Sequence, residues 1–298
     1  MIDAAALLAH PGLEVDYRYD QREVMLHALA TALPTDPMDT DQLPFAYEDL
    51  PNQPLLALPT LPIILGWVDL VRDPRTRDPM LGIDGDQVVV GQASLVLHRA
   101  IAAKGSGRTR TFYAKVVDKG AGRGALVCVR REVCDATHGL LATIDTWLFV
   151  RGAGGFGGPH EGGPPRTPVP ARAPDGVIEN GTSAQQALLY RLVLGDHNAV
   201  HADPAHAAAT GFPQPILHGL ASLSMGIHAA LRGVTGSLTT HAGRLQSAHA
   251  TLARPVHPGD HLRTEAWVKG TDIRFRTSVP ARALVAVEAG SITLVPLS

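Results

Sequence analysis

The sequence has 298 residues, of which 45% are hydrophobic and 18% charged, so it has the composition of a folded chain rather than a disordered one. This length is enough for two domains of ordinary size or one large one. A formal net charge of −2 provides no overall basic field that would attract nucleic acid or an anionic membrane, so we expect neither as a partner.

The N-terminal segment does not have the features of a secretory signal. It starts with an acidic residue rather than a basic stretch, and its apolar run is short. No apolar run elsewhere reaches the roughly 20 residues that cross a bilayer. We therefore expect a cytoplasmic protein.

The first half, residues 1–151, predicts two helices followed by four strands. Asp20 and Glu23 have capping-box spacing, which predicts a short helix over 20–33, and an apolar stretch at 58–71 predicts a second helix. Alternating or β-rich runs then predict strands at 86–101, 110–120, 124–136 and 140–150.

The third of these runs contains both cysteines of the chain. Cys128 and Cys134 would share one face of the strand, too far apart for a disulfide, so we expect two reduced thiols packed in the core. The same alternation places Val127, Val129 and Arg131 on the opposite face.

A segment rich in glycine and proline, residues 152–176, divides the chain into two halves. More than half of its residues are glycine or proline, so it holds neither a helix nor a sheet ladder and is predicted to be a linker along the surface. The second half, residues 177–298, predicts a strand at 184–195 and an apolar helix at 219–231. Four more strands are predicted at 244–256, 261–270, 272–280 and 283–295.

Both halves therefore predict a mostly apolar helix followed by about four antiparallel strands. A helix that is apolar around most of its circumference must be buried, and a curved antiparallel sheet can wrap around it. We expect an α+β protein with two antiparallel sheets, each wrapped around such a helix. This arrangement resembles a double hot-dog fold.

One stretch carries a specific motif: residues 190–219 read YRLVLGDHNAVHADPAHAAATGFPQPILHG. It resembles the hydratase 2 motif of the MaoC-like dehydratases, also called (R)-specific enoyl-CoA hydratases. The motif's central Asp-x-Asn-x-x-His is met by Asp196, Asn198 and His201. The motif occurs only once, so the first half is expected to be catalytically silent and to line an acyl pocket, as in the double hot-dog members.

The resemblance implies reversible hydration of trans-2-enoyl-CoA to (3R)-3-hydroxyacyl-CoA, a hydro-lyase reaction of acyl-CoA and fatty acid metabolism. It implies Asp196, His201 and Asn198 as the catalytic set, and the backbone amide of Gly219 as the oxyanion donor. The partner is an acyl-CoA thioester, whose CoA is part of the substrate, so we expect no cofactor and no metal. A homodimer is also expected. The acyl group and the physiological direction stay open.

The residues suit this chemistry. Hydration of an enoyl thioester needs an activated water, a proton for the α-carbon and stabilisation of charge on the thioester oxygen, and a carboxylate and an imidazole sharing one water can meet the first two needs. Asp196 and His201 are five positions apart, so the loop between them must fold back, and Asn198 is expected to fix either the loop or the histidine tautomer. Gly219 begins the apolar helix, where free N–H groups can bind an enolate oxygen.

The other polar residues of the stretch receive structural interpretations. Asp203 and Pro204 should start a short helix that Gly211 ends. His218 is left outside the catalytic set as a structural or pocket-lining residue. His197 and His206 are expected at the surface, in the loop and on the short helix. His228 is expected to face a polar neighbour or solvent. Ser222 and Ser224 are out of register with a serine that some single hot-dog relatives carry in this helix. Three arginines are either phosphate contacts or solvated surface residues, namely Arg254, Arg274 and Arg276.

Three alternatives remain. A hot-dog acyl-CoA thioesterase would hydrolyse the thioester with a carboxylate and would not need the Asp-x-Asn-x-x-His pattern. A non-catalytic acyl-thioester-binding module would have no reason to keep the acid and the imidazole. A metal-dependent hydrolase fits poorly because Pro204 interrupts the spacing of its candidate ligands, which are Asp196, His197, His201, Asp203 and His206.

Overall fold

The computed structural model describes residues 2–296 and contains one continuous antiparallel sheet of ten strands. The strands of the first half are β1 (Leu13–Tyr19), β2 (Val88–Leu97), β3 (Gly105–Asp118), β4 (Ala125–Asp135) and β5 (Gly139–Val150). Those of the second half are β6 (Gly176–Gly181), β7 (Leu245–Leu252), β8 (His261–Lys269), β9 (Asp272–Val279) and β10 (Leu284–Leu294). All eight strands predicted to follow the two buried helices are therefore confirmed.

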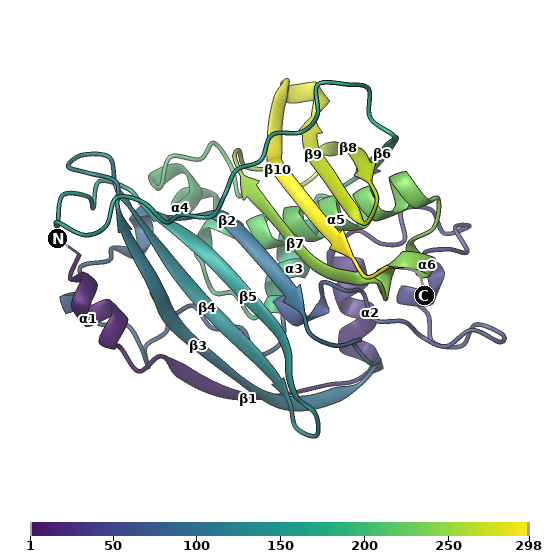
Figure 1. Cartoon of the computed structure of the whole chain (residues 1–298), viewed down its shortest axis with the longest axis horizontal. Helices are drawn as coiled ribbons and strands as arrows, with labels where there is room; N and C mark the ends of the chain where they lie inside the picture. The colour runs from purple at the N-terminus through teal and green to yellow at the C-terminus, as the bar shows by residue number, and fades with distance from the viewer. Residues whose placement is uncertain (1, 297–298) are drawn as a thin grey trace.

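The sheet repeats one topology twice. Its order is β1-β3-β4-β5-β2-β7-β10-β9-β8-β6, so the first five strands have the same order as the last five read from the opposite edge. The two halves join where β2 pairs with β7, in a register that sets Ser94 opposite His249 (Figure 1). The sheets of the two halves were expected to lie side by side as one extended sheet, and the hydrogen bonds between β2 and β7 confirm this.

The long helix α5 (Gly219–Thr235) is the centre of the second half. It packs against every strand from β6 to β10, and all residues from Leu220 to Leu231 are buried (Figure 1). The helix extends four residues beyond the predicted end, to Thr235, and ends where Gly236 adopts a left-handed conformation (φ 76°). The predicted wrapping of a sheet around an apolar helix is confirmed for this half.

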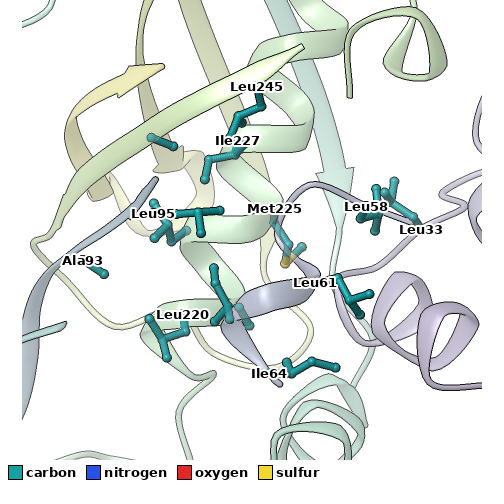
Figure 2. Packing of buried hydrophobic residues seen from close by; sticks show 14 of the residues in the cluster. Leu33, Leu58, Leu61, Ile64, Ala93, Leu95, Leu220, Met225, Ile227 and Leu245 are labelled. Atoms are coloured by element: carbon teal, nitrogen blue, oxygen red, sulfur yellow. The ribbon is translucent and has the colours of Figure 1, made fainter. Parts of the chain in front are cut away.

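The corresponding helix of the first half is absent. Residues 58–71, predicted to be helical, form turns around a single 3-10 turn, Leu61–Ile63. Pro59 and Pro62 lack the N–H that a helix needs, and Gly66 adopts a positive φ of 53°. The segment is nevertheless buried: the buried apolar side chains of residues 58–65 belong to the same hydrophobic cluster as those of α5 (Figure 2), and Val68, Leu70 and Val71 belong to a second cluster. An irregular segment thus fills the position of a second central helix.

The other helices are α1 (Ala4–Ala9), α2 (Gln21–Ala30), α3 (Gln186–Leu194), α4 (Pro204–Ala209) and α6 (Leu238–Ala242). Helix α2 is confirmed with its capping box, in which Asp20 accepts from the Arg22 N–H and Glu23 accepts from the Asp20 N–H. No helix within residues 2–296 combines the length and apolarity needed to cross a membrane.

Residues 184–195 were predicted to be a strand and instead form helix α3. Its buried residues, Gln186, Ala187, Tyr190 and Leu194, recur at helical spacing. Exposed leucines on the opposite side make the run look uniformly apolar, which hid this period. Strands β1 and β6 and helices α1 and α6 were not predicted.

The glycine- and proline-rich segment runs along the surface as expected and leads to β6 (Figure 1). Its irregular part ends one residue before the predicted boundary, since Gly176 already belongs to β6. The Asp118 carboxylate at the end of β3 accepts hydrogen bonds from the Gly155 and Gly157 N–H groups. These backbone N–H groups lower the pKa of Asp118 to about 2, so its side chain is ionised at neutral pH. The ionised carboxylate holds the linker segment against the sheet.

Both cysteines are free thiols, as predicted. Cys128 is buried in a small cluster with Val117 and Trp147, and burial raises its pKa to about 12. Cys134 is only half-buried, so the prediction of a core position is wrong for this residue. It is the second-last residue of β4, next to the half-buried Asp135.

Candidate active site

The motif loop follows helix α3 and folds back as its sequence requires. Gly195 ends α3 in a left-handed conformation with φ 77°, and the Asp196 N–H donates to the Arg191 carbonyl. A 3-10 turn, Ala199–His201, then returns the chain. As a result Asp196 Oδ2 lies 3.7 Å from His201 Nε2 although the residues are five positions apart.

Asn198 holds the loop rather than the histidine. Its side-chain oxygen accepts from the Val200 N–H at 3.3 Å and so caps the 3-10 turn, while its own N–H donates to Asp196 Oδ1 at 2.8 Å. The structure thus selects the first of the two roles expected for Asn198, the fixing of the loop.

The tautomer of His201 is set elsewhere. Its Nδ1 lies 2.8 Å from the carbonyl oxygen of Ile216. A carbonyl can only accept, so Nδ1 carries the proton and Nε2 faces Asp196 with a free lone pair. Burial, followed by the neighbouring His218, lowers the pKa of His201, so the ring is neutral at pH 7 and can act as a base.

His218 is the residue that sequence reasoning left out. Its ring stacks on that of His201 with centroids 3.6 Å apart, and its Nε2 lies 3.5 Å from Asp196 Oδ2. This contact is long for a hydrogen bond, but it is shorter than the distance from Asp196 to His201. The available signal was its place inside the motif, directly before Gly219.

The carboxylate of Asp196 stays ionised although it is buried. Burial alone would raise its pKa, but His218 and the Asn198 N–H interact with the charged form and bring the pKa below its ordinary value. The site therefore combines a carboxylate with a neutral imidazole, separated by a gap that one water can bridge with two hydrogen bonds.

Gly219 is the first residue of α5, as predicted, and lines the same cavity. Within the described part of the chain its N–H has no acceptor. A Cβ at this position would lie 2.6 Å from Cδ1 of Leu252, so only glycine fits without displacing that side chain. The N-terminal end of a 17-residue helix, with a free N–H facing a cavity, is a site suited to a developing negative charge.

A cavity of about 280 Å³ connects these groups. The second half contributes Asp196, His201, His218 and Gly219, together with Leu252. The first half contributes an apolar wall that includes Trp67, Val68, Val90, Val129 and Leu148. Both halves therefore enclose one space beside the carboxylate and the imidazole.

The remaining candidates lie mostly outside this group. Asp203 caps α4 and Pro204 is its first residue, as predicted. His197 is exposed and His206 is half-buried, 3.9 Å from Asp86 at the cavity wall. Ser222 lines the cavity but donates to the His218 carbonyl, while Ser224 donates to that of Leu220.

Two further predictions concern more distant side chains. His228 has the expected polar neighbour, because its Nε2 lies 2.8 Å from Thr60 Oγ1. Of the three arginines, Arg254 lines the cavity, whereas Arg276 pairs with Glu265 and Arg274 is not among the lining residues.

A metal centre built from the five residues considered above is not formed in the described structure. Only Asp196 and His201 of that set come together, joined by His218, with their candidate ligand atoms within 4.8 Å of one another. His201 can offer only Nε2, because Nδ1 is bound to the Ile216 carbonyl.

Comparison with known proteins identifies the family. Residues 166–289 match the model of the MaoC-like domain, and residues 17–152 match that of the MFE-2 hydratase 2 N-terminal domain. The chain is 32% identical over 283 residues to enoyl-CoA hydratase ChsH3 of Mycobacterium tuberculosis, with 95% of this chain and 94% of that protein covered. The chain belongs to the MaoC-like hydratase 2 family. It is therefore an enzyme of the hydro-lyase class.

Other relatives agree with this assignment. Peroxisomal enoyl-CoA hydratase 2 of Arabidopsis thaliana is 32% identical over 286 residues, covering 93% of this chain and 90% of that protein. The crystal structure of a MaoC-like dehydratase from Phytophthora capsici superposes with a TM-score of 0.81 at 27% identity over the full length of both chains. A Mycobacterium tuberculosis protein described as a double hotdog fold, 16% identical, superposes with a TM-score of 0.56 over 95% of this chain and 96% of that one. The predicted double hot-dog class is confirmed.

Proposed function

We propose that this enzyme reversibly hydrates trans-2-enoyl-CoA thioesters to (3R)-3-hydroxyacyl-CoA. The observation that carries the proposal is the pairing of an ionised Asp196 with a neutral His201, whose unprotonated Nε2 faces a carboxylate oxygen 3.7 Å away. This pair adjoins both the free Gly219 N–H and an apolar cavity. The names of the relatives support the substrate class.

The proposed reaction adds one water across the C2–C3 double bond. The water donates one hydrogen bond to Asp196 and one to His201 Nε2. As its oxygen bonds to C3, His201 takes a proton and the π electrons move toward the thioester oxygen, which the Gly219 N–H stabilises. The imidazolium formed beside Asp196 then returns that proton to C2, so both parts of the water end on the product and the enzyme is unchanged.

Two residues act indirectly in this scheme. Asn198 orients Asp196 through its N–H and holds the loop through its side chain. His218 is a positioning residue, since its ring packs against His201 and its Nε2 stabilises the ionised form of Asp196. Arg254 is proposed to meet a phosphate of CoA, because it is exposed and lines the cavity.

The division of labour between the halves is also part of the proposal. Residues 1–151 would be catalytically silent and line the acyl pocket, residues 152–176 would connect, and residues 177–298 would hold the reacting groups. The apolar wall from β2, β4 and β5 supports this role for the first half. The same proposal includes a homodimer, a cytoplasmic location and the absence of any cofactor. Sedimentation of the purified chain tests whether it forms a homodimer.

The test is a hydration assay that follows the loss of enoyl-thioester absorbance across short, long, branched and dicarboxylic trans-2-enoyl-CoAs. We expect at least one class to be hydrated, with the product oxidised by a (3R)-specific but not a (3S)-specific dehydrogenase. Release of free CoA instead would indicate a thioesterase, and loss of turnover in a chelator would indicate a metal enzyme. Binding without turnover would indicate a non-catalytic module.

A further inference from the structure

An arginine lies where the apolar face of β4 would be expected to carry an aliphatic side chain. Arg131 shares that face with Val127 and Val133, and it is only 5% exposed. Its neighbour Arg130 points to the opposite face, where it forms a two-bond ion pair with Asp145. Within residues 2–296, no acidic side chain pairs with Arg131 in this way.

The guanidinium of Arg131 is incompletely satisfied. One of its nitrogens, Nη2, donates to the carbonyl oxygens of Pro62 and Ile63. Its Nε is buried without an acceptor, and none of the ion pairs formed by residues 2–296 includes this side chain. Burial lowers its pKa to about 10, so the group still carries its charge at neutral pH. A buried cation that lacks an anionic partner is costly to keep.

This cation faces the cavity beside the candidate active site. Arg131 and Thr111 both line that cavity, and they are directly paired in the register of β4 and β3. The Thr111 hydroxyl is also buried without a hydrogen-bond partner. Most of the surrounding wall is apolar, and it includes Val129 on β4 and Leu148 on the adjacent strand β5. A polar, positively charged spot therefore interrupts an otherwise apolar surface.

Arg131 and the reacting groups come from different halves of the chain. Arg131 belongs to β4, whereas Asp196, His201 and Gly219 belong to the second half, and all four residues line the same cavity. Arg131 also donates to the Pro62 and Ile63 carbonyls in the irregular segment of the first half. An acyl chain that extends from the reacting groups along the apolar wall of the first half would therefore lead toward Arg131.

We infer that Arg131 selects enoyl-CoA substrates whose acyl chain carries a carboxylate at its far end, with Thr111 donating a second hydrogen bond to that group. The inference rests on the proposed hydratase function and names its substrate class. A carboxylate supplies the missing charge and accepts from Nη1, the guanidinium nitrogen that is neither fully buried nor hydrogen-bonded among the described residues.

A purely structural role would be to hold the carbonyls of Pro62 and Ile63. The two roles differ in what they change: losing a structural contact lowers activity toward all substrates alike, whereas losing a substrate contact changes the ratio between substrates. The experiment therefore measures a ratio.

The test compares kcat/KM for pairs of trans-2-enoyl-CoA esters of equal chain length, one ending in a carboxylate and the other in a methyl group. The series runs from short to long chains. The variants are Arg131→Gln, which keeps an N–H donor for Ile63 without the charge, and Thr111→Val, which removes only the hydroxyl. Arg130→Gln is the matched control, since it removes a charge from the next residue on the opposite face.

We expect the wild type to prefer the carboxylate ester at one chain length. The preference should fall about tenfold to a hundredfold in Arg131→Gln, the cost of one charge-assisted hydrogen bond. It should fall less in Thr111→Val and stay unchanged in Arg130→Gln. As a measurement that needs no variant, the carboxylate-ended hydroxyacyl-CoA should raise the melting temperature of the wild type more than its methyl-ended counterpart.

Equal rates for both members of every pair, or equal thermal protection by the two products, would overturn the inference and leave the hydratase proposal intact. A carboxylate preference that survives in Arg131→Gln would also overturn it. Failure to hydrate any ester of either type would instead overturn the proposed function, and the inference with it.

Discussion

Replacing Gly219 with proline or alanine isolates the backbone N–H that is proposed to stabilise the enolate. Proline removes this hydrogen, and its fixed φ suits the first residue of a helix. The preceding residue, His218, already has φ −58° and ψ 136°, the extended conformation that a residue before proline prefers. The backbone of α5 therefore accommodates Gly219→Pro.

Gly219→Ala is the matched control, because both variants introduce a Cβ. That Cβ would lie 2.6 Å from the Leu252 Cδ1, so Leu252 must move in either variant, and a Leu252→Ala background removes the collision from both. Loss of one preorganised donor costs about 10² to 10³ in turnover, or roughly 2.7 to 4 kcal/mol of transition-state stabilisation. We expect the proline variant to be slower than the alanine variant by that factor.

The assay is steady-state hydration of the best enoyl-CoA substrate, with melting temperatures recorded for each variant. Equal and high activity of the proline and alanine variants at similar melting temperatures would refute the assignment, because the thioester oxygen would then be held elsewhere. An alanine variant as inactive as the proline variant, even in the Leu252→Ala background, would show that close approach of the substrate matters more than the N–H.

Three further predictions follow from the buried polar groups. Asp196→Asn and His201→Gln should each lower turnover by about 10² to 10⁴ with unchanged far-UV circular dichroism, and near-normal rates in both would contradict their roles. His218→Phe keeps a ring against His201 but loses the group that lowers the Asp196 pKa, so the acid limb of the kcat/KM profile should move to higher pH; an unmoved limb would reduce His218 to a packing residue. Burial lowers the pKa of His27 to about 3 and that of His228 well below 6.5, so the unfolded chain binds protons that the folded chain does not. The free energy of unfolding should therefore fall as the pH drops from about 6.5 toward 3, with His27 contributing on the order of a few kcal/mol and His228 acting in the same direction. Chemical unfolding at a series of pH values should show a shallower dependence in His27→Leu, and an unchanged slope would contradict this.

Elements with a strong local signal could be predicted from the sequence. The capping box at Asp20, the eight alternating strands after the two buried segments and the apolar helix beginning at Gly219 all appear in the structure. Each is specified by its own residues, through a cap, a period of two or an apolar circumference. β1 has an equally clear alternation, with Leu13, Val15 and Tyr17 on one face, and could have been predicted.

Elements decided by tertiary contacts could not be predicted in the same way. Residues 58–71 are apolar enough for a buried helix, but Pro59, Pro62 and Gly66 prevent one. The segment is buried through tertiary packing, residues 58–65 in the cluster of α5 and the remainder in a second cluster with strands of the first half. Helix α3 carries exposed leucines at positions 188 and 192, so its apolar run fitted a strand equally well.

The candidate site likewise contains features that the sequence predicted and features that depend on tertiary contacts. The motif identified Asp196, Asn198 and His201, and its spacing required the loop to fold back. It did not reveal that the Ile216 carbonyl sets the His201 tautomer, because that contact joins residues 15 positions apart. Nor did it show that His218 lies nearer to Asp196 than His201 does. Arg131 was placed on the apolar face of its strand, but only the fold turned that face toward the cavity.

The most direct test of the account is the configuration of the product formed in deuterated water. If one water held between Asp196 and His201 supplies both the hydroxyl and the proton, the two must reach the same face of the double bond. Nuclear magnetic resonance of the 3-hydroxyacyl product should then show one deuterium at C2, added syn to a (3R)-hydroxyl, at a rate that Asp196→Asn lowers strongly. Anti addition, a (3S)-hydroxyl or an undiminished rate in Asp196→Asn would contradict the proposed pair.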